Sequence, residues 1–150
     1  MALALAQREE ALAVGAVNTI HNENGELTGY NTDVFGVLTA IERVAGITTL
    51  PSKCVVLGAG GAARAVTYGL ASRPEVETVV LLNRTTERAE ALATDMEKIT
   101  GKAICPGGMD VEEQRTAFSD AGLVVNTTSL GMYPNVDASP LSDPSVIHPD

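Results

Sequence analysis

The sequence predicts a doubly wound α/β fold, in which helices cover both faces of a parallel sheet. From Ser52 onward, short apolar runs alternate with helical patterns, which is typical of parallel strands joined by right-handed crossovers. The chain is 45% hydrophobic but only 3% aromatic, so its core consists mainly of Val, Leu, Ile and Ala. Such a core suits a buried parallel sheet. A length of 150 residues is enough for a single core.

The first thirty residues follow a different pattern. Residues 1–13, MALALAQREEALA, are strong helix formers, and we expect a helix that ends before Gly15. Two strand-like segments follow, AVNTIH at 16–21 and ELTGYN at 26–31. They flank an Asn-Gly pair, which indicates a β-hairpin.

A longer helix should follow the hairpin. The segment NTDVFGVLTAIERVAG, residues 31–46, has a helical pattern. Thr32 or Asp33 could accept hydrogen bonds from the first-turn amides, and Gly46 follows the last turn. The segment TTLPS, residues 48–52, then reads as a linker.

The rest of the chain supplies the parallel sheet. We expect strands at KCVVL (53–57), ETVVLLN (77–83), KAICP (102–106) and GLVVNTT (122–128). We expect helices at GAARAVTYGLAS (61–72), TERAEALATDMEKIT (86–100) and VEEQRTAFSD (111–120). The tail, residues 134–150, is rich in Pro, Ser and Asp and is expected to be a loop.

Charge and composition exclude several function classes. A net charge of −9 argues against a nucleic-acid or anionic-membrane partner. No signal peptide or membrane-spanning run is recognisable, so we expect a cytoplasmic protein. Cys54 and Cys105 lie beside apolar residues, which indicates reduced, buried thiols. His21 and His148 have no metal-ligand spacing, and no metal is expected.

A glycine-rich loop, LGAGGAARA at 57–65, lies between a predicted strand and a predicted helix. Gly58, Gly60 and Ala63 fill the pattern G-x-G-x-x-G/A of dinucleotide-binding loops. The first glycine allows a tight turn, the second lets the backbone approach a pyrophosphate, and the small third residue permits close helix packing. The alternative is a simple tight turn. The position between strand and helix favours the Rossmann-like interpretation.

The residues after the second strand indicate which dinucleotide binds. NAD-binding domains place an acid there to hold the ribose hydroxyls, but this chain has Asn83 and Arg84, with Arg88 one turn later. Two guanidinium groups would suit the 2′-phosphate of NADP. The alternative is a solvated helix start in which these arginines pair with Glu87 or Glu90.

Five segments together resemble the shikimate/quinate dehydrogenase family. They are GAVNTI (15–20), GYNTDVFG (29–36), VLGAGGAARA (56–65), LLNRTTERA (81–89) and VNTTSLGM (125–132), and they match in order and spacing. The resemblance implies an NADP-dependent oxidoreductase that reversibly reduces 3-dehydroshikimate to shikimate in aromatic amino acid biosynthesis. It does not separate shikimate from quinate as the substrate.

The resemblance also implies roles for particular residues. The substrate would be bound by Asn18, Thr32 and Asp33, of which Asp33 would be the catalytic carboxylate. The pyrophosphate would lie on Gly58, Ala59, Gly60, Gly61 and Ala62, and the adenosine ribose phosphate on Asn83, Arg84, Thr85 and Arg88. Asn126, Thr128 and Ser129 would line the cofactor cleft. Without the resemblance, Asp33 would be interpreted as a helix cap.

The chain departs from the family pattern at both ends. The family's serine pair and catalytic lysine, in a segment resembling NVTxPxK, are not found, and the first lysine is Lys53. A carboxyl-terminal segment with tyrosine and glutamine contacts is also not found. We therefore expect a substrate-domain remnant at 1–32, a connecting helix and linker at 33–50, and an NADP-binding domain at 51–150 that is incomplete at its C-terminus.

Two other functions stay open at this point. One is a non-catalytic NADP-binding module, and the other is the nucleotide domain of a protein like glutamyl-tRNA reductase, which has a similar glycine loop. In each case an incomplete sheet would have an exposed edge, through which the chain could form a homo-oligomer.

Overall fold

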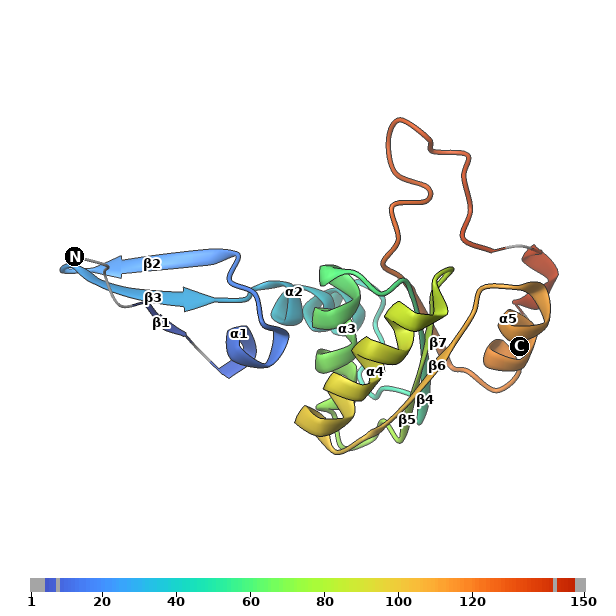
Figure 1. Cartoon of the computed structure of the whole chain (residues 1–150), viewed down its shortest axis with the longest axis horizontal. Helices are drawn as coiled ribbons and strands as arrows, with labels where there is room; N and C mark the ends of the chain where they lie inside the picture. The colour runs from blue at the N-terminus through green and yellow to red at the C-terminus, as the bar shows by residue number, and fades with distance from the viewer. Residues whose placement is uncertain (1–4, 8, 142, 148–150) are drawn as a thin grey trace.

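The chain forms two β-sheets of different size (Figure 1). The computed structural model describes residues 5–7, 9–141 and 143–147. The smaller sheet, in the order β1-β3-β2, consists of β1 (Leu5–Gln7), β2 (Thr19–Glu23) and β3 (Glu26–Tyr30). The larger sheet, in the order β6-β5-β4-β7, consists of β4 (Lys53–Leu57), β5 (Thr78–Leu82), β6 (Ala103–Gly107) and β7 (Leu123–Asn126).

The larger sheet is wholly parallel, and its strand order places a crevice at one edge. β4 pairs with β5 on one side and with β7 on the other. Leu57, the last residue of β4, is in register with Leu82 and Asn126, so the carboxyl ends lie level. The order reverses beside β4, and open α/β sheets bind ligands at such a switch point. The predicted α/β fold is confirmed.

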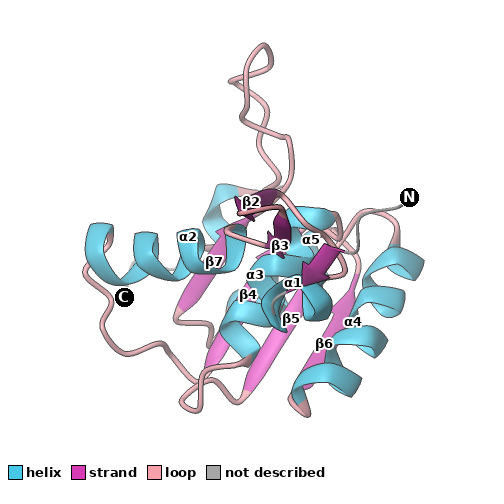
Figure 2. Ribbon diagram, turned by 90° about the vertical axis from the view of Figure 1, so that its left-hand side faces the viewer, coloured by secondary structure: helices cyan, strands magenta, loops and turns pink. Residues whose placement is uncertain are grey.

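Helices cover both faces of the larger sheet (Figures 1 and 2). α3 (Gly61–Ala71) and α4 (Thr86–Thr100) lie on one face, and α5 (Val111–Phe118) lies on the other with the short 3-10 helix η2 (Pro144–Val146). Side chains alternate along β4. Cys54 and Val56 belong to the core under α3 and α4, whereas Val55 and Leu57 belong to the core under α5. This period of two makes the four β4 residues from Cys54 to Leu57 core residues on alternate faces of the sheet.

The N-terminal segment packs against this domain through helix α2. α1 (Glu9–Val14) precedes the hairpin, and α2 (Asp33–Thr39) follows it and continues as a π-helical turn, η1 (Ala40–Val44). α2 approaches α3 closely at Gly69, where an added Cβ would lie 3.3 Å from Val34 Cγ1. Val14, Val34 and Ala65 form a small core there. The start of α2 is thereby fixed relative to the larger sheet.

The single helix predicted over residues 1–13 is wrong. Leu5–Gln7 pairs in parallel with β3, and the helix begins only at Glu9. Backbone pairing to a neighbouring strand outweighs the weak intrinsic preference of a short helix. Residues 1–4 and 8 of the predicted helix lie outside the described residues. The hairpin, the later helix and the strands and helices from residue 53 onward are confirmed, with ends that differ by up to three residues, and the predicted C-terminal loop contains the short helix η2.

The two cysteines have different environments. Cys54 is buried as predicted, and burial raises the pKa of its thiol to about 11. Cys105 is exposed, so the prediction of a buried thiol is wrong there. It lies on β6, an edge strand of the larger sheet, and an edge strand is less covered than a central one. The division at residues 32 and 50 stays a prediction. No helix among the described residues could cross a membrane.

Candidate functional site

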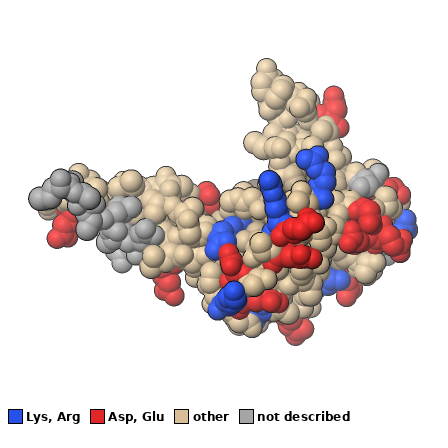
Figure 3. Space-filling view, viewed as in Figure 1, with Lys and Arg blue, Asp and Glu red and all other residues tan. Residues whose placement is uncertain are grey.

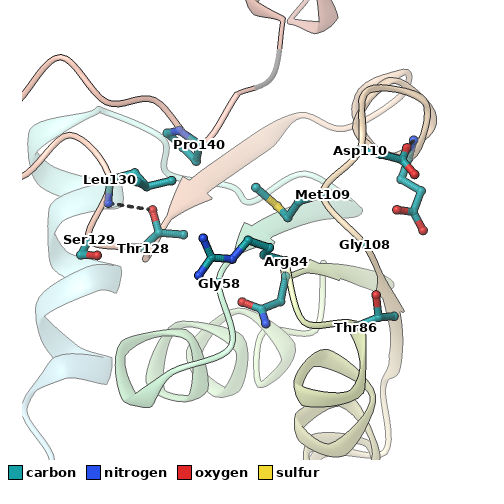
Figure 4. Close-up of a pocket in the computed structure, with 12 residues that line it drawn as sticks. Gly58, Arg84, Thr86, Gly108, Met109, Asp110, Thr128, Ser129, Leu130 and Pro140 are labelled. Carbon is teal, nitrogen blue, oxygen red and sulfur yellow. Dashed lines mark hydrogen bonds between the residues drawn. The ribbon is translucent and has the colours of Figure 1, made fainter.

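A cleft of about 750 Å³ lies at the carboxyl ends of the four parallel strands (Figure 4). Each strand is followed by residues that line it: Gly58 after β4, Asn83 and Arg84 after β5, Gly108 and Met109 after β6, and Thr128 and Ser129 after β7. Leu130 and Pro140, from the loop after β7, form a further wall. The cleft therefore lies at the switch point that the strand order defines.

Gly58 forms the floor of the cleft, and only glycine fits there. Its φ of +110° lies in a region that other residues rarely adopt. An added Cβ would also lie 2.7 Å from Oγ1 of Thr127, which is fixed because it donates a 2.6 Å hydrogen bond to the carbonyl of Leu57. The Gly58 amide donates to the carbonyl of Leu82. The first glycine of the loop thus joins three strand ends.

The next two glycines leave open space at the start of α3. Gly60 is the N-cap residue, has extended backbone and no side-chain cap. Apart from the adjoining backbone, no atom of the described residues lies within 4 Å of an added Cβ at Gly60 or Gly61. Ala63 is fully buried, as the predicted helix packing requires. The first-turn amides of a helix lack intrahelical partners, so this end can bind an anion.

Two exposed arginines flank the glycine loop without ion-pair partners among the described residues. The side chain of Arg84 extends across the cleft toward Gly58 (Figure 4). Among the described residues neither Arg84 nor Arg88 forms an ion pair, so pairing with Glu87 or Glu90 is not seen, whereas both side chains are exposed as a solvated helix start would also have them. Asn83 Nδ2 donates a 2.8 Å hydrogen bond to the carbonyl of Thr85 and fixes the turn into α4.

The predicted cofactor residues divide between two adjoining hollows. Arg88 lines a smaller hollow of about 330 Å³ between α3 and α4, together with Ala59, Gly60 and Gly61. Gly58, Asn83, Arg84, Thr128 and Ser129 line the larger cleft. Ala62, Thr85 and Asn126 line neither hollow.

Asn126 shapes the loop after β7. Its Oδ1 accepts hydrogen bonds from the amide (2.9 Å) and hydroxyl (2.7 Å) of Thr128, and its Nδ2 donates to the carbonyl of Leu130. The Leu130 amide donates in turn to the Thr128 hydroxyl (Figure 4). Asn126 therefore supports the residues that face the cleft.

The predicted substrate residues gather at the start of α2. Oδ1 of Asn18 accepts hydrogen bonds from the amide (3.0 Å) and hydroxyl (3.1 Å) of Thr32. Asp33 has an exposed side chain and forms no ion pair among the described residues. Asn18, Thr32 and Asp33 do not line the cleft or the smaller hollow.

The predicted cap of this helix is wrong. Thr32 is the N-cap residue, but its helical backbone (φ −92°, ψ −6°) gives no side-chain cap, and its hydroxyl bonds to Asn18 instead. The side chain of the buried Asn31 accepts a 3.0 Å hydrogen bond from the Asp33 amide. Its Nδ2 donates to the carbonyl of Ala16, so Asn31 also joins the helix to the chain before the hairpin.

Sequence reasoning missed two residues near the site. Arg64 forms a 3.0 Å ion pair with Asp95 that joins α3 to α4 beside the smaller hollow. Gln114 is fully buried, and its Nε2 donates 3.0 Å hydrogen bonds to the carbonyls of Met109 and Pro140. The signal for Gln114 was its spacing, three and four residues before the buried Ala117 and Phe118 on one helix face.

The end of the cleft beside α5 is acidic. Asp110 and Glu113 line it, and acidic side chains gather over α5 in Figure 3. Asp110 is the N-cap of α5, because its Oδ1 accepts a 2.8 Å hydrogen bond from the Glu113 amide. The described residues contain no cluster of three or more His, Cys, Asp or Glu side chains that could hold a metal ion.

A parallel sheet that reverses its strand order at a glycine loop, with a cleft at its carboxyl ends, defines a dinucleotide-binding domain of the Rossmann type. Residues 42–129 match the Shikimate / quinate 5-dehydrogenase family. This chain belongs to that family. The resemblance seen in the sequence is confirmed, and the glutamyl-tRNA reductase alternative is set aside.

Individual relatives agree with this assignment. The shikimate dehydrogenase (NADP(+)) of Symbiobacterium thermophilum is 45% identical over 137 residues, which cover 89% of this chain and 45% of that protein. A structure of the Listeria monocytogenes shikimate 5-dehydrogenase with shikimate and NAD superposes with a TM-score of 0.84 at 29% identity, covering 97% of this chain and 51% of that one. The Thermus thermophilus shikimate 5-dehydrogenase with NADP(H) and shikimate gives 0.72 at 37% identity, covering 97% and 48%. The chain spans about half the length of the curated relatives it matches.

Proposed function

We propose that this chain is the NADP-binding part of a shikimate dehydrogenase, which reversibly reduces 3-dehydroshikimate to shikimate. The observation that supports NADP is Arg84, an exposed arginine that has no ion-pair partner in the described ranges and lies in the cleft opposite Gly58. Asn83 occupies the place where NAD-binding domains carry an acid. The relative from Symbiobacterium thermophilum is named for NADP.

The shape of the site fits a dinucleotide. The open space over Gly60 and Gly61, together with the free amides of α3, suits a pyrophosphate. The pyrophosphate would bind along Gly58, Ala59, Gly60, Gly61 and Ala62. The ribose phosphate would bind to Asn83, Arg84, Thr85 and Arg88. Thr128 and Ser129, supported by Asn126, would form the wall opposite Arg84.

The residues near α2 would handle the substrate. When bound, NADPH supplies the hydride for reduction of the ketone. The carboxylate of Asp33 would accept a hydrogen bond from a substrate hydroxyl and support a nearby proton donor electrostatically. Its backbone is held by Asn31, and Thr32 beside it is held by Asn18. The Asp33 carboxylate itself is exposed and free of ion pairs among the described residues.

Cofactor choice tests the first half of the proposal. Calorimetric titration should show that NADP binds at least about tenfold more tightly than NAD, a factor that needs about 1.4 kcal/mol. Arg84→Asp should abolish or invert this preference. Arg43→Asp is the matched control, because Arg43 is an exposed arginine on η1 that lines neither hollow. Equal affinity of the native chain for both cofactors would overturn the NADP assignment.

The role of Asp33 requires a complete dehydrogenase that contains this segment. Asp33→Asn preserves the shape of the side chain but removes its charge. Turnover should fall by about a hundredfold or more, while the affinity for NADP stays within a few fold. Near-normal turnover would leave Asp33 with no catalytic role.

The larger sheet has a free edge with which a second copy of the chain could pair. β7 is an edge strand, and its half-buried apolar residues Leu123, Val124 and Val125 lie beside unpaired backbone groups. Such an edge can pair with a second copy. Light scattering should therefore detect a homo-oligomer, and a purely monomeric chain would contradict this part of the proposal. The cytoplasmic location stays a prediction.

A further inference from the structure

Gln114 is a polar side chain in the middle of an apolar core. It lies on α5 and is fully buried. Its Nε2 donates one 3.0 Å hydrogen bond to the carbonyl of Met109 and another to the carbonyl of Pro140. Burying a polar group is costly unless hydrogen bonds compensate it, so these two bonds account for an amide at this position.

The two carbonyls that Gln114 joins belong to two separate segments that line the cleft. Met109 follows β6, and Pro140 ends the long loop after β7. Both residues line the cleft and lie on the side away from Gly58 (Figure 4). They are 31 residues apart in the sequence, and the amide of Gln114 spans the space between them.

Within the described part of the chain, the loop that ends at Pro140 has few other attachments. It extends away from the rest of the molecule (Figure 1), and Met132, Tyr133 and Val136 are 63%, 90% and 60% exposed. Its first turn is fixed by Asn126. After Pro140, Leu141 packs against the core under α5, and Val146 is fully buried in that core. Gln114 supplies the anchor at the cleft itself.

We propose that Gln114 is a positioning residue for the cofactor. Its amide holds Pro140 against α5 and ties the loop after β7 to the segment after β6, so that this side of the cleft is already formed before a dinucleotide binds. Without this amide, the loop end would move freely, and binding would have to order it. The inference rests on the proposed NADP site.

The test compares two variants that both weaken the core. Gln114→Met keeps the length and burial of the side chain but cannot donate to either carbonyl. Val76→Ala opens the fully buried core at the amino-terminal end of β5, away from the cleft. Each variant should lower the stability of the chain to unfolding. Only Gln114→Met should weaken NADP binding, by about tenfold, and only it should speed amide exchange at residues 138, 139 and 141.

Gln114→Asn provides the second variant if Gln114→Met does not fold. It keeps the amide but is one methylene shorter, so it can reach at most one carbonyl. Its affinity for NADP should therefore lie between that of the native chain and that of Gln114→Met. Normal NADP affinity in a folded Gln114 variant, or an equal loss of affinity in Val76→Ala, would overturn the inference. If the native chain itself fails to bind NADP, the proposed function fails, and the amide exchange rates at residues 138, 139 and 141 then still decide whether Gln114 holds the loop.

Discussion

A methyl group added at Gly58 should destabilise the fold strongly and one added at Gly60 only slightly, whereas both should weaken NADP binding. Gly58 has a φ of +110°, and an added Cβ would lie 2.7 Å from Oγ1 of Thr127. Gly60 has extended backbone (φ −95°, ψ −167°), and, apart from the adjoining backbone, an added Cβ would meet no atom of the described residues within 4 Å. Gly58→Ala should therefore unfold easily, whereas Gly60→Ala should not.

The size of the difference follows from the geometry. Holding alanine at the φ of Gly58 costs about 1–3 kcal/mol. Moving the Thr127 hydroxyl away breaks its hydrogen bond to the Leu57 carbonyl, which adds about 1 kcal/mol. Gly58→Ala should thus lose about 2–4 kcal/mol in the free energy of unfolding. Gly60→Ala should lose less than about 1 kcal/mol, the cost of a poorer N-cap residue.

NADP binding should weaken in both variants. The Cβ of Gly60→Ala would occupy the space through which the pyrophosphate approaches the backbone, so the affinity for NADP should fall by at least about tenfold. Urea unfolding without cofactor and calorimetric NADP titration measure the two effects separately. Equal stability loss in both variants, or normal NADP affinity in Gly60→Ala, would refute the reasoning.

Two further predictions concern stability and thiol reactivity. A hydrogen bond from Lys53 holds the pKa of Asp120 below its usual range. The ionised pair therefore stabilises the native chain at pH values above the ordinary aspartate pKa. This stabilisation is lost as the pH falls through the lowered pKa of Asp120. Urea unfolding should therefore show that the native chain has a higher free energy of unfolding than Asp120→Asn at pH 7, and that this difference disappears below about pH 4. A difference that stays constant down to about pH 2 would contradict this. Cys105 is exposed and Cys54 is buried with a raised pKa, so a thiol reagent at neutral pH should label Cys105 in the native chain and both cysteines only after denaturation. Rapid labelling of both in the native chain would contradict the packing of β4.

Most of the larger sheet was predictable because its signals are local. The run KCVVL and the glycines after it define β4 and the turn into α3 without reference to any other segment. The first strand was not predictable, because Leu5–Gln7 is a strand only through its pairing with β3, twenty-two residues later. Cys105 was misjudged for a similar reason, since its exposure depends on the position of β6 at the sheet edge.

The site was predictable where a residue type carries its own chemistry. Gly58 and Arg84 could be identified from their places after two strands, and both line the cleft. The role of Asn31 could not, because it depends on the carbonyl of Ala16, and the spacing of Gln114 indicates a buried position but not the carbonyls that it joins. The absence of ion pairs at Arg84 and Arg88 among the described residues also required the structure.

The central claim is that NADP binds at the carboxyl ends of the four parallel strands. Titration of the isotopically labelled chain with NADPH, followed by amide NMR, tests this claim most directly. The largest shifts should occur at Gly58, Gly60 and Gly61, and next at Arg84 and Thr128, while the hairpin β2–β3 stays unchanged. Shifts that are absent, or that gather away from the glycine loop, would contradict the account.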